Sequence, residues 1–380
     1  MKNKKLVINI KVIIIVLSLM FISLSSCSEK TEPNLIKFGA ILPLTGTAAF
    51  YGEWCKKGID LAVEEINNAG GIANKKIKIL YGDSKNDMRE GVSWAHKMIN
   101  EDISVIISAM TGVSFAIIPI IDKAKKILFM TIVTHPEATS KSEWAFRDYI
   151  NKGKAAKKMA EFAFNDMKLR KIALLYINDE GGLGEKSSFE SEFKKLGGDI
   201  VGEVSFDKTT SDLKSELIKI ADFKPEAIYF SGYGRIYGVG IKQIKEMKIQ
   251  AKVLASYEPL YKTTQELAGD ALEGVVFTSP YFEEENPQTK NFIEKYRSKY
   301  GEKPEIDAAF GYDVIMLLAQ AIKTGAKTSE DIKNNLIKIN NYPGVVGRIS
   351  ILPNRDTEIP VIIRTFKNGK IITISKSYEQ

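Results

Sequence analysis

Short runs of β-branched and apolar residues alternate with helix-length amphipathic segments along most of this chain. The alternation predicts parallel sheets whose strands are connected by crossover helices. Several runs are continuously apolar, as expected for strands that are covered on both faces. The runs lie at 36–43, 76–83, 103–108, 127–134, 171–178, 199–206, 227–233, 251–257 and 274–281.

An internal repeat indicates more than one domain. The order strand, helix, Gly-Gly, strand occurs at 36–83 and returns at 171–206. Within the first repeat, Ile59, Val63 and Ile66 recur at intervals of four and three, the spacing of one helix face. The chain is also longer than a single hydrophobic core usually supports. We therefore expect two α/β domains of similar build.

The N-terminus has the three parts of an export signal: lysines, an apolar stretch at 12–24, and small residues before Cys27. The apolar stretch is shorter than the roughly 20 residues that a membrane-spanning helix needs. A buried core helix, the alternative, rarely follows a basic N-terminus. We therefore predict that residues 1–26 are a cleavable signal peptide.

The tetrapeptide Leu24-Ser25-Ser26-Cys27 resembles the lipobox of bacterial lipoproteins. The resemblance implies that Cys27 is lipidated and becomes the first mature residue, with residues 27–34 as a tether. Stable anchoring takes more than one acyl chain. The expected product is an exported soluble protein, periplasmic or at the cell surface, held to the membrane by its N-terminal lipid.

Composition narrows the classes of partner. The net charge is +7, but the leader contributes four of the lysines, and the remaining lysines are not clustered. Nucleic acid is therefore not expected as a partner. Once Cys27 is lipidated, Cys55 has no disulfide partner, and its position on an apolar helix face makes it a core residue rather than a reactive thiol. His96 and His135 lie far apart, so we expect neither a metal site nor a cofactor.

The common catalytic motifs are absent. Glu185 interrupts the phosphate-loop pattern within 181–188, and the glycines of 232–238 do not have dinucleotide-binding spacing. No nucleophile-elbow motif occurs, and His135 has no evident partners for a triad. A hydrolase or dehydrogenase is therefore disfavoured, and we expect a protein that is not an enzyme.

Polar residues follow many of the predicted strands. Ligands of doubly wound sheets bind at the carboxyl ends of the strands, and in two-domain proteins they favour the cleft between domains. Hydroxyls and helix N-termini can hold a carboxylate, and a carboxylate can hold an ammonium. A polar, zwitterionic ligand would suit the residues at these positions, which are Thr45, Tyr51, Asp83, Thr111, Gly112, Thr134, His135, Asp179, Tyr233 and Glu258.

Residues 38–83 resemble the opening of the leucine/isoleucine/valine-binding protein family, the type I periplasmic solute-binding receptors of ABC importers. The segments GYGRIYGVGIKQIKEM, SYEPL and LAGDALEGVVFTSPYF continue the likeness, which covers 35–380. The resemblance implies the type I periplasmic-binding-protein fold: two doubly wound parallel-sheet domains joined by a three-crossing hinge, with a cleft that closes round the ligand. The lobes would comprise 35–150 plus 282–350, and 151–281 plus 351–380.

The same resemblance implies a function. An extracytoplasmic receptor of this kind would capture an amino acid or a similar amine-bearing small molecule and deliver it to an ABC permease and its ATPase. Two alternatives stay open at this point. The chain could be the ligand-sensing module of a signalling system, or it could bind another solute, such as an amide or a carboxylate.

Site residues can be carried over only where the sequence matches the family pattern. Tyr51 and Tyr233 would line opposite walls of the cleft. Val133, through its carbonyl, and Thr134, through its hydroxyl, would hold the ligand head group. Glu258 would bind the ligand ammonium.

Three positions depart from the family pattern. Gly112 stands where a serine helps to bind the ligand carboxylate, so Thr111, Ser114 or a backbone N–H would have to replace that hydroxyl. Gly181 stands where an aromatic residue lines the wall, which should widen the pocket. Asp307 stands near a second aromatic position. Together these changes suggest a ligand that is larger or more cationic than leucine.

Overall fold

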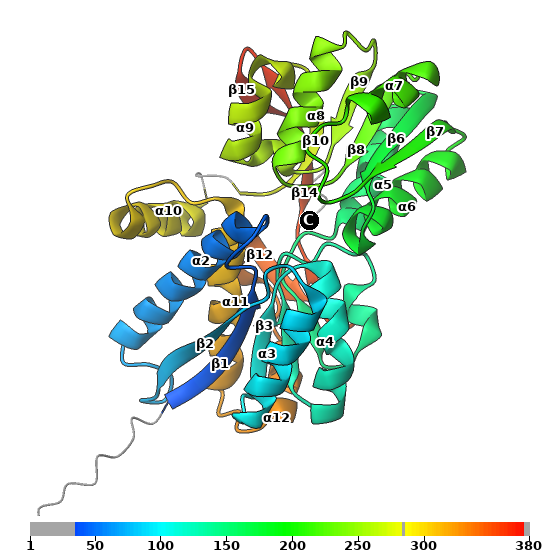
Figure 1. The fold of residues 1–380 in the computed structure, drawn as a ribbon. Coiled ribbons are helices and arrows are strands. Elements are labelled where there is room, and N and C mark those ends of the chain that lie inside the picture. The colour runs from blue at the N-terminus through cyan, green and yellow to red at the C-terminus, as the bar shows by residue number, and fades with distance from the viewer. Residues whose placement is uncertain (1–34, 283–285, 376–380) are drawn as a thin grey trace, which may run out of the picture.

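A computed structural model describes residues 35–282 and 286–375, so the predicted signal peptide, the tether and Cys27 lie outside the described part. The described chain forms two α/β lobes, an N-lobe and a C-lobe, which are stacked one above the other in Figure 1. One hydrophobic core lies mainly in the N-lobe but includes Tyr257 and Tyr261 of the C-lobe, and the other two cores cover the two faces of the C-lobe sheet. The predicted fold class is confirmed.

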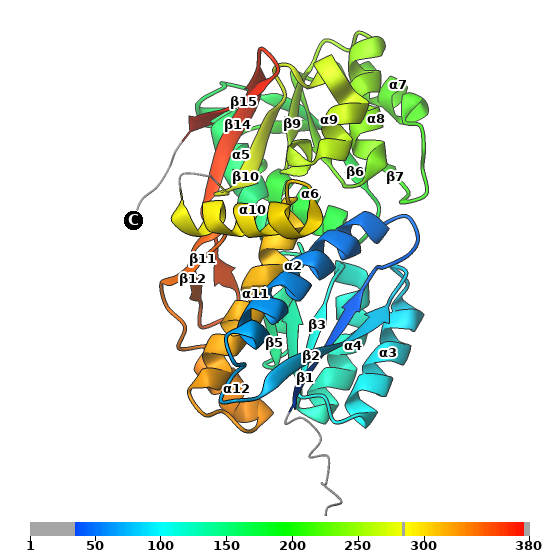
Figure 2. The ribbon, with the colours of Figure 1, turned by 90° about the vertical axis from the view of Figure 1, so that its left-hand side faces the viewer.

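The N-lobe is built on a five-stranded, all-parallel sheet. Helices α2 (Ala49–Asn68) and α11 (Ile306–Lys323) pack together on one face, and α3 (Met88–Asn100) and α4 (Thr111–Ala124) pack on the other (Figures 1 and 2). The strands lie in the order β2 (Lys76–Asp83), β1 (Leu35–Leu42), β3 (Val105–Ser108), β4 (Ile127–Met130) and β5 (Ala145–Arg147).

Close packing of α2 on α11 depends on two glycines. A Cβ atom on Gly58 would lie 1.9 Å from the carbonyl oxygen of Ala308, and one on Gly311 would lie 2.4 Å from that of Cys55. Only glycine lets the two backbones approach so closely. Cys55 is fully buried in this interface, as its place on the apolar helix face predicted.

The C-lobe is built on a seven-stranded sheet. Helices α5 (Lys152–Asn165) and α6 (Glu180–Lys195) cover one face, while α7 (Lys214–Asp222), α8 (Arg235–Glu246) and α9 (Lys262–Ala268) cover the other. The strands lie in the order β15 (Lys370–Ser375), β14 (Val361–Lys367), β10 (Val276–Pro280), β9 (Lys252–Ala255), β8 (Ala227–Ser231), β6 (Lys171–Ile177) and β7 (Asp199–Phe206). Unlike the expected all-parallel sheet, its edge is antiparallel, because β14 and β15 form a hairpin beside β10.

A small antiparallel sheet lies next to the N-lobe and is followed by the last passage of the chain into the C-lobe (Figure 2). Its strands are β11 (Tyr342–Gly344), β12 (Gly347–Ile351) and β13 (Thr357–Glu358). The remaining helices are α10 (Pro287–Tyr300), α12 (Ser329–Leu336) and the 3-10 turns η1 (Ala138–Lys141), η2 (Glu258–Leu260) and η3 (Gly269–Leu272).

The chain passes between the lobes after β5, after β10 and before β14, which gives the three crossings expected. At the last crossing, the Arg147 guanidinium is bidentate to Asp356, with nitrogen–oxygen distances of 2.8 and 2.6 Å. The lobe boundaries stay a prediction. Because Asp356 is tied in this way to β5, we place the last crossing after residue 358 rather than at 351.

The nine predicted runs all contain strands of the two large sheets, and both repeats form parallel pairs, β1 with β2 and β6 with β7. The sequence reasoning missed β5 and the strands β11 to β15. Within the described residues, no helix combines the length and the apolar character that crossing a membrane requires.

Candidate functional site

A cavity of about 90 Å³ lies between the lobes. It is bounded by the segments that follow β1, β2, β3, β4 and β5 of the N-lobe and β6, β7, β8 and β9 of the C-lobe. This is the position predicted from the sequence, at the carboxyl ends of the strands. Its walls are formed by Tyr51, Asn86, Met88, Met110, Thr111, Gly112, Val113, Ile132, Thr134, Lys152, Asp179, Glu180, Gly181, Lys208, Tyr233, Tyr257 and Glu258.

Most of the predicted site residues come together in this cavity. Tyr51, Thr111, Gly112 and Thr134 line it from the N-lobe side, and Gly181, Tyr233 and Glu258 line it from the C-lobe side. The structure thus brings together residues that are up to 207 positions apart in sequence.

Two predicted residues lie behind the wall instead. Val133 is fully buried, and its carbonyl accepts a hydrogen bond from Arg147 at 3.2 Å. Asp307 is also fully buried and accepts a hydrogen bond from the Tyr149 hydroxyl at 2.6 Å. Burial raises the pKa of Asp307 to about 6, although the hydrogen bond from Tyr149 acts in the opposite direction. Neither side chain faces the cavity.

Three polar residues from the strand ends have local roles. The Thr45 hydroxyl donates to Asp83 at 2.6 Å, so these two side chains fasten the loop after β1 to the end of β2. His135 packs its ring against Phe115, with centroids 5.1 Å apart. None of the three residues lines the cavity. A position at a strand end is therefore necessary for cavity contact but not sufficient.

Tyr51 connects the two lobes at the cavity wall. Its hydroxyl donates to Glu258 at 3.1 Å and accepts the backbone N–H of Gly234 at 2.9 Å. Tyr51 comes from α2 of the N-lobe, whereas Gly234 and Glu258 belong to the C-lobe. The structure therefore shows the lobes joined across the cleft by hydrogen bonds.

Glu258 is the carboxylate of the inner wall and is 1% exposed. Burial raises the pKa of Glu258 to about 7, while Lys152 and the Tyr51 hydroxyl lower it. The sequence Tyr257-Glu258-Pro259 begins the short turn η2 directly after β9, which is why this side chain is held at the sheet edge. A buried carboxylate needs a partner of opposite charge or a proton.

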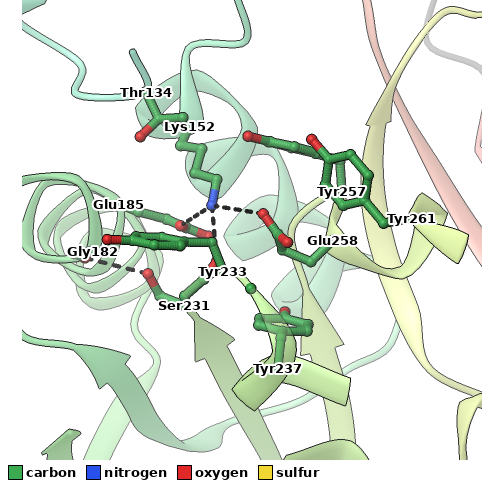
Figure 3. A network of polar contacts seen from close by, with 12 residues as sticks. Thr134, Lys152, Gly182, Glu185, Ser231, Tyr233, Tyr237, Tyr257, Glu258 and Tyr261 are labelled. Carbon is green, nitrogen blue, oxygen red and sulfur yellow. Dashed lines mark hydrogen bonds and ion pairs between the residues drawn. The ribbon is translucent and has the colours of Figure 1, made fainter. Parts of the chain in front are cut away.

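Lys152, which the sequence reasoning missed, supplies that opposite charge (Figure 3). Its ammonium lies 3.8 Å from Glu258 and 3.2 Å from Glu185, and it donates to the carbonyl of Gly232 at 3.1 Å. It also lies 5.0 Å from the centre of the Tyr257 ring. Burial alone would lower the pKa of Lys152, but Glu185 and Glu258 raise it above its ordinary value.

Tyr233 and Asp179 form the opposite part of the C-lobe wall. The Tyr233 hydroxyl donates to Asp179 at 2.6 Å. The other carboxylate oxygen of Asp179 accepts the backbone N–H of Gly182 at 2.8 Å and so caps α6. The tyrosine ring is thereby fixed in place at the cavity edge.

The N-terminus of α4 faces the cavity without a side-chain cap. The helix begins at Thr111, after Met110, and no side chain accepts from its first N–H groups. Thr111, Gly112 and Val113 all line the cavity. Unpaired N–H groups and the helix dipole make such an end suitable for a carboxylate.

The backbone is strained beside this helix end. Met110 has a φ of 71° and Ile132 a φ of 53°, and the N–H of Met110 donates to the carbonyl of Ile132 at 3.2 Å. Positive φ is unfavourable for ordinary residues, above all for a β-branched one, and costs about 1–3 kcal/mol at each site. Both residues line the cavity. Strain of this kind clusters at ligand-binding sites.

Two glycines depart from the family pattern: Gly112 of the N-lobe faces the C-lobe, and Gly181 of the C-lobe faces the N-lobe. A Cβ atom on Gly112 would lie 3.3 Å from the Glu180 carboxylate, and one on Gly181 would lie 3.1 Å from the Thr134 hydroxyl. The absence of side chains at both positions therefore lets α4 and α6 approach across the cleft. Together with the small cavity, this geometry does not favour a ligand larger than leucine.

Comparison with known proteins identifies the family. The family model described as periplasmic binding protein matches residues 35–368. The chain belongs to the periplasmic binding protein family. It resembles Leu/Ile/Val-binding protein homolog 3 of Brucella melitensis biotype 1, with 29% identity over 270 residues, 70% of this chain and 72% of the relative. The resemblance noted in the sequence is thereby confirmed, and this periplasmic binding protein is a solute-binding receptor of the ABC-transporter class.

Solved structures agree with the family. The leucine-binding protein LivK from Thermotoga maritima superposes with a TM-score of 0.82 at 27% identity, covering 90% of this chain and 98% of that one. The branched-chain amino acid transporter substrate-binding protein LivJ from Streptococcus pneumoniae, solved with isoleucine, gives 0.81 at 27% identity, covering 90% and 100%. Members of the family are receptors rather than enzymes, and membership implies export from the cytoplasm.

Proposed function

We propose that this periplasmic binding protein captures an amino acid, or a close analogue, in the cavity between its lobes and delivers it to the permease and ATPase of an ABC importer. It would bind its solute without chemical turnover. Lipidation of Cys27, which lies outside the described residues, would hold the receptor at the membrane. The relatives support the ligand class, since LivJ from Streptococcus pneumoniae was solved with isoleucine.

One arrangement supports this proposal most directly: an uncapped helix N-terminus and a buried carboxylate line the same cavity from opposite lobes. The uncapped N-terminus of α4 at Thr111 and Gly112 would receive the ligand carboxylate. Glu258 lies in the opposite lobe, retains acceptor capacity beyond its bond to Tyr51, and would receive the ammonium. Backbone N–H groups would then replace the hydroxyl that is missing at Gly112.

The ligand side chain would lie against the aromatic and apolar part of the wall. Tyr51 and Tyr233 approach each other from opposite lobes, with ring centroids 6.3 Å apart. Met88 and Met110 add flexible apolar surface. A small apolar or weakly polar side chain suits a cavity of about 90 Å³. Closure of both lobes on one ligand would make the closed form the state that the transporter recognises.

A thermal-shift and calorimetry screen tests the proposal. The protein is first unfolded and refolded in dialysis to remove any solute from the expression host, and is then assayed against the twenty amino acids. A ligand that binds only the folded state adds about 2.7 kcal/mol of stability at 100 times its Kd. We expect a clear shift with one or a few small neutral amino acids. If the refolded protein shows none, while carboxylates or amides without an amine bind, the amino-acid assignment is wrong.

A further inference from the structure

Lys152 places a cation inside the proposed amino-acid site, in addition to the ammonium of the ligand. It is the first residue of α5, its side chain is 3% exposed, and it lines the cavity. Among the charged residues of the cavity wall, Lys152 and Glu258 are the two that are almost completely buried. Figure 3 shows the ammonium directed at Glu185 and Glu258. The charge is therefore part of the binding site itself.

We infer that Lys152 is a built-in counter-ion of Glu258, which makes the cleft select a solute whose head group has no net charge. This inference rests on the proposed function, because it concerns the ligand of the same cavity. It differs from the suggestion from the sequence, which was a ligand larger or more cationic than leucine. That suggestion counted the carboxylates of Glu258 and Asp307 but not the ammonium of Lys152, which lies 3.8 Å from Glu258.

The contacts of the Lys152 ammonium hold it in place but do not use all of its N–H donors. Of its three N–H donors, one makes a hydrogen bond of 3.1 Å to the carbonyl of Gly232. Glu185, which also accepts from Tyr229 at 2.9 Å, pairs with it at 3.2 Å. The separation from Glu258 is 3.8 Å, too long for a hydrogen bond. Lys152 and Glu258 thus present a donor and an acceptor side by side to the cavity.

This arrangement determines which ligands the site tolerates. A cationic ligand would bring a second positive charge next to the Lys152 ammonium, where burial weakens the screening by water. An anionic ligand would meet Glu258, with Glu185 directly behind Lys152. A zwitterion can direct its ammonium at Glu258 and its carboxylate at the α4 N-terminus or at Lys152, and adds no net charge to the site. Like charges brought together in this way are a common means of rejecting wrong partners.

Other cations near the cavity cannot take over this role. Lys208 lines the cavity but its side chain is exposed, so water screens it. Arg147 is buried but is bidentate to Asp356. The aromatic neighbours of Glu258, including Tyr51 and Tyr257, have hydroxyl pKa values raised by burial and stay neutral. Among the described residues of the cavity, Lys152 alone is a buried cation.

The test compares two probes that differ only in the carboxylate: L-isoleucine, which is zwitterionic, and 2-methylbutylamine, its decarboxylated and cationic counterpart. Calorimetry gives the ratio of their Kd values for the full-length chain and for Lys152→Gln, Lys152→Arg and Lys157→Gln. Lys157 lies on the exposed side of α5 and is the matched control. We expect Lys152→Gln to lower the amine-to-isoleucine Kd ratio about tenfold or more. Lys152→Arg and the control should leave that ratio within about twofold.

A second measurement does not depend on the identity of the ligand. Melting temperatures of the ligand-free protein are compared for Lys152→Gln, Glu258→Gln and the double variant. Removing one member of a buried pair leaves the other charge uncompensated, so we expect the double variant to melt higher than the sum of the two single shifts predicts. Strictly additive shifts would overturn the inference, and so would an unchanged probe ratio.

The two measurements also separate this inference from the proposed function. If neither probe binds but the melting temperatures show coupling, the pairing of Lys152 with Glu258 is supported and the choice of an isoleucine-like ligand is overturned. If isoleucine binds and Lys152→Gln tolerates the amine no better than the unsubstituted protein does, the amino-acid assignment stands and the selective role of Lys152 is overturned.

Discussion

Replacing Tyr51 by phenylalanine should weaken ligand binding while leaving the lobes folded. The substitution removes one hydroxyl oxygen and keeps the ring that packs beside Tyr261 and Trp54. That hydroxyl makes two hydrogen bonds in the structure, one to Glu258 at 3.1 Å and one from the Gly234 N–H at 2.9 Å. Both cross the cleft, so they exist only while the lobes are together. Their loss should therefore affect closure and binding.

The size of the effect follows from the chemistry of these two contacts. A hydrogen bond to a charged acceptor contributes about 1.5–3 kcal/mol, and every 1.4 kcal/mol changes Kd tenfold. The bond to Glu258 alone therefore predicts an affinity loss of roughly 10- to 150-fold. Gly234 is half-buried, and its N–H can bind water when the cleft opens. We therefore assign no further loss of affinity to the hydrogen bond that it makes with Tyr51. We expect the melting temperature of the ligand-free protein to change little.

Calorimetry with the ligand found in the amino-acid screen measures the loss, and small-angle scattering reports how much of the protein is closed. Tyr300→Phe is the matched control: it removes a hydroxyl that donates to the Lys57 carbonyl at 3.0 Å, away from the cavity. If Tyr51→Phe changes affinity no more than Tyr300→Phe does, the hydrogen bonds across the cleft do not contribute to ligand capture. Closure of the lobes would then not depend on the Tyr51 hydroxyl.

Three further predictions concern other parts of the proposal. Burial raises the pKa of Glu258 from 4.5 to about 7, so between these pH values the folded protein binds a proton more readily than the unfolded chain does. The free energy of unfolding should therefore fall as pH rises from about 4.5 through 7. Thermal melts taken across this range should show a flatter slope for Glu258→Gln. Gly181→Phe should fill the gap towards Thr134, where even a Cβ atom would lie 3.1 Å from the hydroxyl, and abolish binding in calorimetry; retained affinity would show that the ligand lies elsewhere. Cys27→Ala should move the protein from the membrane fraction to the soluble fraction and remove incorporation of labelled fatty acid, whereas unchanged fractionation would contradict the lipid anchor.

The larger secondary structures could be predicted because their signals are local. Each apolar run is long enough to show the composition of a buried strand, and the runs at 76–83 and 199–206 match β2 and β7 residue for residue. The strand β5 was missed because it has only three residues. That miss also hid Lys152, which follows β5 at the same sheet edge as the predicted site residues. The hairpin of β14 and β15 did have a signal, Asn368-Gly369, and both residues have positive φ as such a turn requires.

The sequence by itself determined the alternation of strands and helices, the sheet edge at which polar residues gather, and eight of the 17 residues that line the cavity. These features depend on periodicity and on neighbours along the chain. Only the tertiary structure decided which charged and polar side chains contact one another. Tyr51 and Glu258 are 207 positions apart, yet their side chains share a hydrogen bond. The Lys152 ammonium lies beside two carboxylates from two other elements of the C-lobe. The behaviour of a buried charge depends on distances of a few ångströms in three dimensions, and spacing along the chain does not contain them.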